Sequence, residues 1–272
     1  MTFTNTFKRK ACRVIAALAA VACTMSLAAC GADETGKIRI GIKFDQPGLG
    51  FKKSGTYVGF DVDVAKYVAK KLGYSEDQII WKEAPSKQRE AMIQNGDVDM
   101  ILATYSITDE RKKAVDFSSS YYNDSQSVVV KKDSKFANAT KVSDLKDATV
   151  GVMVGTLAYD YAKANIKDDI QTFNDDAALA QALDAGQIDA LVTSTVECVY
   201  MVQSEQVKDA KVLGRLPDSE DKSGMGIVLP KDSKLTAAVT KAVDDLNADG
   251  TIKKLQDKWL AEYTTDLTEL KK

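Results

Sequence analysis

Arg111 is the residue of this chain whose chemistry is easiest to assign, because a guanidinium presents a planar fork of N–H groups that matches a carboxylate. Catalytic groups are harder to find, since the 272 residues include no histidine. That absence excludes a Ser-His-Asp or Cys-His relay, a zinc site built on histidine and an imidazole base. The alternative for Arg111 is a solvated surface arginine, because Asp109 and Glu110 precede it directly.

The overall composition describes a folded protein of one large or two modest domains. Hydrophobic residues make up 44% of the chain and charged residues 28%, which argues against intrinsic disorder. Lys and Arg number 37 against 39 Asp and Glu, a net charge of −2 that offers no electrostatic footprint for nucleic acid. The acidic residues are scattered without the spacing of a calcium loop. We therefore expect no metal, no cofactor and no nucleic-acid partner.

The first 29 residues have the pattern of a secretory signal. A basic start precedes an apolar stretch over 14–27 that is too short for a stable transmembrane helix. The Leu-Ala-Ala-Cys ending at Cys30 resembles the bacterial lipobox, which implies cleavage before Cys30 and lipid attachment to its thiol. We expect a signal peptide over 1–29, a lipidated Cys30 with a tether over 30–36, and a protein anchored outside the cell membrane. The alternative is an ordinary signal peptide in which Cys30 is incidental.

The cysteines indicate a chain without an internal disulfide. Cys12 and Cys23 lie in the signal and Cys30 is expected to carry lipid, which leaves Cys198 alone. Cys198 lies within an apolar run, so we interpret it as a small core residue rather than a nucleophile.

The segment from residue 38 to residue 104 alternates between strand and helix patterns. An apolar stripe follows Asp61, which is placed to cap a helix that Gly73 ends. The last strand is mostly apolar, which is typical of a strand buried on both faces. Strands are expected over 38–42, 79–81 and 98–104, and helices over 61–72 and 88–94. This order predicts an α/β domain with a mostly parallel central sheet.

The same pattern recurs in the second half of the chain. Residues 186–194 echo residues 96–104, an alignment that pairs Gly186 with Gly96, Asp189 with Asp99 and Ser194 with Thr104. Gly151 likewise echoes Gly41 within the first strand of each unit. Two similar α/β lobes explain the echo more economically than chance does.

Two further strands, over 127–131 and 226–229, each end in a charged turn and are interpreted as connections between the lobes. Lobe 1 is expected to comprise 37–128 plus 228–272, and lobe 2 to comprise 129–227. Each lobe would hold a mostly parallel sheet flanked by helices. A ligand cleft is expected between them, at the carboxyl ends of the parallel strands.

An ordered set of segments resembles the polar amino-acid substrate-binding proteins of ABC importers, the bacterial extracellular solute-binding protein family 3. The segments are GFDVDV at 59–64, NGDVD at 95–99, SITDER at 106–111, VDFS at 115–118, DGT at 249–251 and KW at 258–259. The resemblance covers nearly all of 37–263 and, over 40–48 and 84–89, is strongest to the glutamate-binding branch. It implies a periplasmic-binding-protein type II fold with two lobes joined by two crossover strands.

The resemblance also implies how an amino acid would be held. Arg111 would grip the α-carboxylate, with Ser106 and Thr104 adding hydroxyl groups from the first lobe. Thr156 and nearby backbone N–H groups would meet the same carboxylate from the second lobe, although a threonine there is equally suited to cap a helix.

The remaining site residues concern the ligand's side chain and its ammonium group. Arg89 matches the arginine that acidic amino-acid binders direct to the side chain, and Lys43 could add a second cation; the alternative is that both are solvated. Ser194 stands where the family has an aspartate for the ammonium group. A serine cannot neutralise a buried ammonium. Glu197 would compensate if the local register shifts, or would face water as part of a helix.

These features predict an extracytoplasmic lipoprotein, not an enzyme, that captures a polar amino acid, glutamate or aspartate, by hinge closure and delivers it to an ABC permease. The expected partners are the amino acid, the transmembrane subunits of the permease and the membrane, with the protein a monomer. The alternatives are an exported dehydratase-like or lyase-like enzyme on the same fold and a ligand-sensing surface module.

Overall fold

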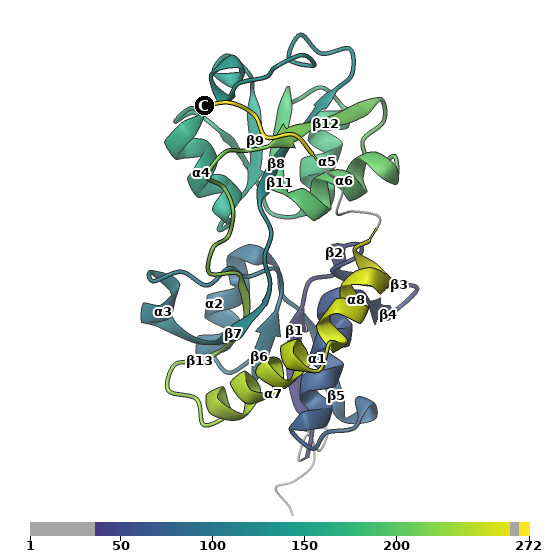
Figure 1. Cartoon of the computed structure of the whole chain (residues 1–272), viewed down its shortest axis with the longest axis vertical. Helices are drawn as coiled ribbons and strands as arrows, with labels where there is room; N and C mark the ends of the chain where they lie inside the picture. The colour runs from purple at the N-terminus through teal and green to yellow at the C-terminus, as the bar shows by residue number, and fades with distance from the viewer. Residues whose placement is uncertain (1–35, 262–266) are drawn as a thin grey trace, which may run out of the picture. The chain divides into compact units, whose positions relative to one another are not determined.

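The computed structural model describes residues 36–261 and 267–272, and residues 37–272 form a compact unit with two α/β lobes (Figure 1). The expected signal peptide and the lipidated Cys30 lie outside the described residues. Among the residues that are described, none of the helices combines the length and the apolar character needed to cross a membrane.

Lobe 1 is built on a five-stranded sheet in the order β5-β1-β6-β13-β7, in which β5, β1 and β6 run parallel and β13 is antiparallel to its neighbours. Its strands are β1 (Ile38–Ile42), β5 (Ile79–Glu83), β6 (Met100–Leu102), β7 (Val115–Tyr122) and β13 (Met225–Pro230). Its helices are α1 (Phe60–Lys71), α2 (Arg89–Gln94), α3 (Arg111–Ala114), α7 (Thr236–Ala248) and α8 (Thr251–Trp259). A small antiparallel sheet of β2 (Asp45–Gln46), β3 (Gly50–Lys53) and β4 (Thr56–Val58) follows β1.

Lobe 2 repeats this plan in the order β10-β9-β11-β8-β12, with β10, β9 and β11 parallel. Its strands are β8 (Gln126–Lys131), β9 (Val150–Met153), β10 (Gln171–Phe173), β11 (Ala190–Ser194) and β12 (Ala210–Arg215), and its helices are α4 (Leu157–Asn165), α5 (Asp176–Asp184) and α6 (Thr195–Gln203). The predicted fold class is confirmed.

The strand expected to be buried on both faces is β6. Met100 and Leu102 pack into one core cluster with α1 and α7, while Ile101 and Ala103 pack into a second cluster beside α2. A run without polar alternation therefore carries two apolar faces. Cys198 is fully buried in a core cluster of lobe 2, as expected.

The sequence echo between the lobes corresponds to one repeated structural role. The Asp99 carboxylate accepts the backbone N–H of Arg39 at 2.8 Å, and the Asp189 carboxylate accepts that of Thr149 at the same distance. Each aspartate thus satisfies a backbone donor beside the start of a central parallel strand, β1 or β9. The repeat is a repeat of hydrogen bonding as well as of sequence.

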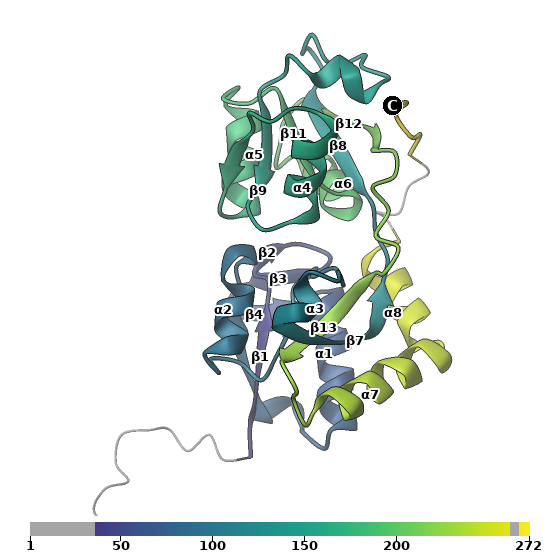
Figure 2. The same cartoon turned by 90° about the vertical axis from the view of Figure 1, so that its left-hand side faces the viewer.

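The lobe boundaries differ from the expected ones by a few residues. Strand β8 pairs with lobe 2 from Gln126 onward, and β13 pairs with lobe 1 from Met225 onward. The connections between the lobes are therefore the segments 123–125 and 216–224 (Figure 2).

The last residues of the chain belong to lobe 2, although we expected all of 228–272 in lobe 1. Helix α8 packs with α1 and α7 in lobe 1, but Leu270 lies in a core cluster of lobe 2. Its N–H donates to the Arg215 carbonyl at 2.8 Å, and the Arg215 N–H donates to the Thr268 carbonyl at 2.9 Å. The last described residues are therefore held against β12 by one buried leucine and its paired backbone groups.

Asp61 does not cap α1, contrary to expectation. The helix begins at Phe60, and Gly59 occupies the N-cap position without a side-chain cap. The Asp61 carboxylate is fully buried, where it accepts the Thr104 N–H at 3.3 Å and the Tyr121 hydroxyl at 3.1 Å. It therefore ties α1 to the end of β6, the edge of the sheet at which the site lies.

Candidate functional site

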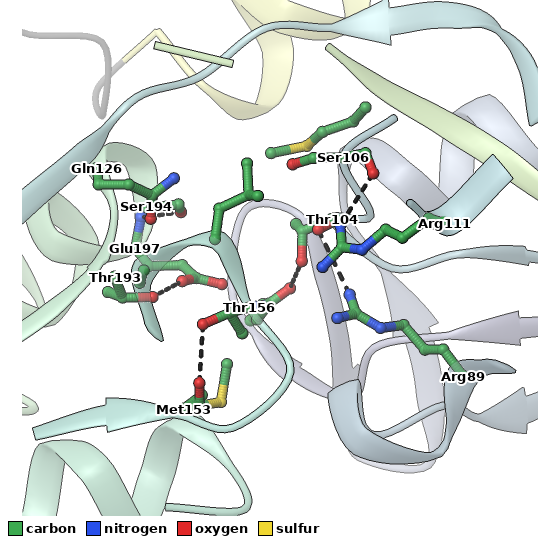
Figure 3. Close-up of a pocket in the computed structure, with 14 residues that line it drawn as sticks. Arg89, Thr104, Ser106, Arg111, Gln126, Met153, Thr156, Thr193, Ser194 and Glu197 are labelled. Carbon is green, nitrogen blue, oxygen red and sulfur yellow. Dashed lines mark hydrogen bonds between the residues drawn. The ribbon is translucent and has the colours of Figure 1, made fainter. Parts of the chain in front are cut away.

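A polar pocket lies between the lobes, at the carboxyl ends of β6, β9 and β11 (Figure 3). Its empty volume is about 390 Å³, including its opening to solvent. Six of the seven predicted ligand-binding residues line it: Arg89, Thr104, Ser106, Arg111, Thr156 and Ser194. It also includes Gln46, Gln126, Thr193 and Glu197, of which only Glu197 was considered from the sequence. Gln46 lies shortly after β1, where the rule of strand ends could have found it. Gln126 lies at the start of the antiparallel strand β8, where that rule gives no signal.

Arg111 lies in the pocket wall at the start of α3 rather than on an open surface. Its Nη1 donates to the Ser106 carbonyl at 2.9 Å and its Nη2 to the Gly155 carbonyl of lobe 2 at 3.2 Å. The guanidinium carbon lies 3.9 Å from the centre of the Tyr105 ring. Burial lowers the pKa of Arg111, which raises the gain from an anionic partner. Its remaining N–H groups have no hydrogen-bond partner among the described residues.

Arg89 is almost fully buried, and most of its guanidinium N–H groups donate to backbone carbonyls. It donates to Ser86 at 3.0 Å, to Ala103 at 2.7 Å and to Gly155 at 2.9 Å. Burial and the nearby charge of Arg111 lower its pKa. No carboxylate among the described residues forms an ion pair with either arginine, so the two guanidiniums make one uncompensated cationic wall.

Thr104 and Ser106 follow β6 directly. Thr104 has a φ of 49°, a left-handed conformation that is costly for a β-branched residue. Its hydroxyl donates to the Gln46 side chain at 3.0 Å. The carbonyl of Ser106, two residues further along the chain, accepts the hydrogen bond from Arg111.

Thr156 serves as the N-cap of α4, one of the two roles considered for it. Its hydroxyl donates to the Met153 carbonyl at 2.8 Å and accepts the Tyr159 N–H at 3.2 Å. The residue lines the pocket all the same, beside the N-terminus of the helix. That end of α4 presents backbone N–H groups and a positive partial charge.

The opposite side of the pocket carries a carboxylate. Glu197 is 4% exposed, and its Oε2 accepts the Thr193 hydroxyl while its Oε1 has no hydrogen-bond partner among the described residues. Burial raises the pKa of Glu197. Ser194 caps α6 by accepting the Glu197 N–H at 3.4 Å. Figure 3 shows Glu197 across the pocket from Arg89 and Arg111.

Lys43 does not line the pocket, contrary to expectation, and it is not solvated either. It is fully buried, with its Nζ 3.0 Å from Asp45 Oδ1 and 3.6 Å from Asp176 Oδ2. Burial opposes its charge, but the carboxylates of Asp176, Asp45 and Glu197 together outweigh burial and raise the pKa of Lys43. A cation so placed is already paired within the protein.

Two aspartates, the fully buried Asp61 of α1 and the half-buried Asp124 of the connection 123–125, predict an unusual pH dependence of stability. Burial raises the pKa of Asp124 to about 7 and that of Asp61 to about 6. A carboxyl whose folded pKa exceeds its unfolded value contributes stability below the unfolded pKa and loses it as pH rises through the folded pKa. We expect the free energy of unfolding to fall by a few kcal/mol between about pH 4 and pH 7, the interval between the unfolded and the folded pKa values. Chemical denaturation across this range measures it.

Asp124→Asn is expected to flatten this pH dependence, because it removes the carboxyl group with the higher pKa of the two. The exposed Asp109→Asn serves as the matched control and is expected to leave the profile unchanged. A profile of Asp124→Asn that coincides with the wild-type profile would rule out Asp124 as its source.

Two α/β lobes around a polar pocket with a cationic and an anionic wall define a two-lobed solute-binding protein. Residues 38–262 match the family described as bacterial extracellular solute-binding proteins, family 3, and the chain belongs to that family. The resemblance inferred from the sequence motifs is confirmed.

Individual relatives cover most of the chain. The glutamate-binding protein GluB of Corynebacterium glutamicum is 34% identical over 96% of this chain and 95% of its own length. The ABC transporter glutamine-binding protein GlnH of Bacillus subtilis is 32% identical over 83% of this chain and 82% of its own. The solved structure of an ancestral arginine-binding protein bound to arginine has a TM-score of 0.75 at 33% identity, covering 83% of this chain and 98% of that one.

Proposed function

We propose that this protein is the extracytoplasmic substrate-binding component of an ABC importer and that it binds a polar amino acid, glutamate or aspartate, between its lobes. The observation that carries the proposal is Arg111, a partly buried guanidinium in the pocket with N–H groups left for a ligand. Such a group binds a carboxylate through two parallel hydrogen bonds. Relatives named for glutamate and glutamine binding support the same substrate class.

The charges of the pocket favour an acidic amino acid. Two arginines and one glutamate line it, which leaves one positive charge in excess. Glutamate and aspartate carry one net negative charge, with two carboxylates for the cationic wall and one ammonium for the other side. Arg89 already donates to backbone carbonyls and therefore has fewer free N–H groups than Arg111. Arg111 and the N-terminus of α4 would hold the α-carboxylate, and the remaining N–H groups of Arg89 would contact the ligand's side chain.

Glu197 is the proposed partner of the ammonium group. Ser194 lies at the position for which the resemblance implies an aspartate. Its hydroxyl oxygen caps α6 by accepting the Glu197 N–H. The buried Oε1 of Glu197 has no hydrogen-bond partner among the described residues and faces the pocket. A carboxylate there neutralises a buried ammonium, which a serine hydroxyl cannot do.

We propose binding and delivery rather than catalysis. An enzyme on this fold would need an acid and a base aimed at a reacting carbon, and the pocket lining has one carboxylate, opposite the arginines. The mature protein would be a monomer. A lipid on Cys30 would anchor it at the outer face of the cell membrane, within reach of the permease. A ligand-sensing role would use the same pocket without delivery.

The experiment is a thermal-shift screen of residues 31–272 against the common amino acids, dicarboxylates without an amine and small peptides. A ligand at 100 times its Kd adds about 2.7 kcal/mol, which raises Tm by several degrees. We expect glutamate or aspartate to give the largest shift. A response confined to amine-free acids would refute the amino-acid assignment, and consumption of the ligand, followed by NMR, would indicate the enzyme instead.

A further inference from the structure

A buried ion cluster joins the two lobes behind the pocket. Lys43 and Asp45 follow β1 in lobe 1, and Asp176 is the first residue of α5 in lobe 2. The Lys43 ammonium lies between the two carboxylates, 3.0 Å from Asp45 and 3.6 Å from Asp176. The Asp45 carboxylate also accepts the backbone N–H of Asp176 at 3.0 Å. Two polar contacts of one cluster therefore cross from lobe to lobe.

The cluster is closed to solvent. The side chains of Lys43, Asp176 and Asp45 are exposed by 0%, 1% and 8%. Both Asp176 oxygens lack a hydrogen-bond partner among the described residues, so Lys43 is the group that compensates this carboxylate. Glu197 adds a further negative charge, which raises the pKa of Asp176 together with burial. Without Lys43, the cluster would hold buried carboxylates and no cation.

We infer that Lys43, Asp45 and Asp176 form an interlobe latch that stabilises the closed form and raises ligand affinity without touching the ligand. The contacts with Asp176 and its backbone N–H can form only when the lobes come together, because they join residues of different lobes. The N-terminus of α5 also favours the Asp45 carboxylate through its partial positive charge. These are positioning residues: they act on the ligand through the closure equilibrium. The inference rests on the proposed function and assigns Lys43 a role different from side-chain recognition.

Removing the cation of the latch and removing one of its carboxylates are expected to have unequal effects on affinity. Lys43→Met leaves the carboxylates uncompensated in the closed form, so we expect affinity to fall on the order of 100-fold. The loss is expected to be equal for every ligand that binds the wild-type protein, and to arise mainly from faster dissociation. Asp176→Asn removes the ion pair between the lobes but leaves Lys43 paired with Asp45, so it is expected to lower affinity far less than Lys43→Met does. In the double variant Lys43→Met/Asp176→Asn, about tenfold or more of the lost affinity is expected to return.

The experiment measures Kd and dissociation rates of these variants by calorimetry and stopped flow, and the radius of gyration with and without ligand by small-angle scattering. Lys52→Met is the matched control, because Lys52 forms an exposed ion pair with Glu83 inside lobe 1. If Lys43 instead touched the ligand's side chain, Lys43→Met would weaken glutamate selectively and Asp176→Asn would rescue nothing. Either result overturns the latch. A wild-type protein that binds no amino acid refutes the proposed function, whereas loss of rescue with wild-type binding intact refutes the latch alone.

Discussion

Replacing Arg111 with methionine is expected to lower the affinity for the amino acid by a factor of about 100 or more. The ligand's α-carboxylate would lose two charge-assisted hydrogen bonds, each worth about 1.5–3 kcal/mol net. Arg111→Lys is expected to recover only part of the loss, since an ammonium retains the charge but not the planar fork. Stability should change little, because Arg111 is half-buried and its two backbone acceptors lie at the edge of an open pocket. Calorimetric titration and thermal denaturation separate the two effects.

The control is Lys112→Met, the next residue on the same short helix, where Lys112 forms an exposed pair with Asp109. That variant should bind as the wild type does. An Arg111→Met protein that is folded and keeps its affinity within about threefold, less than 1 kcal/mol, would show that the carboxylate lies elsewhere.

Replacing Glu197 with glutamine is expected to move affinity and stability in opposite directions. Affinity for amino acids should fall about 10- to 100-fold, because the ammonium group would lose its charged partner in a buried site. Stability without ligand should rise at neutral pH, since burial raises the pKa of Glu197 and its ionised form is therefore the costly one. Glutamine keeps the size of the side chain and its bond to Thr193.

Ligands without an amine provide the control for this prediction. Their binding to Glu197→Gln should be as strong as to the wild type or stronger, because a buried negative charge has been removed from a pocket that holds their carboxylates. Equal losses for glutamate and for its amine-free analogue would show that Glu197 shapes the pocket and does not pair with the ammonium. The two variants therefore test the two walls of one pocket separately.

The two walls come from different lobes, which is the basis for coupling between binding and closure. Arg89 and Arg111 belong to lobe 1 and Glu197 to lobe 2, so a zwitterionic ligand satisfies both walls only when the lobes are together. The Gly155 carbonyl of lobe 2 accepts hydrogen bonds from both arginines and holds the same arrangement. Closure thus depends on ligand charge at one end of the interface and on the Lys43 cluster at the other.

Local patterns in the sequence determined the fold and most of the site. The glycine and aspartate positions repeated in the two halves predicted two matching lobes, and in the structure both aspartates accept a backbone N–H beside a central strand. A ligand cleft was expected at the carboxyl ends of the parallel strands, and Thr104, Ser106, Thr156 and Ser194, which the family resemblance placed there, do line one pocket. Strand direction and hydrophobic periodicity are properties of short segments, so they can be predicted from the sequence.

Only the tertiary structure decided which of the candidate charges remain available to a ligand. The sequence made Arg111 the main candidate for a carboxylate and Lys43 a possible second cation. In the structure Lys43 is paired with carboxylates from both lobes, while Arg111 keeps donors for a ligand. The tertiary structure also decided the place of Leu270, which pairs with β12 of lobe 2 although the preceding helix α8 belongs to lobe 1. Whether a charge or an apolar side chain is satisfied depends on partners far away in the chain, and burial sets the cost of leaving it unsatisfied.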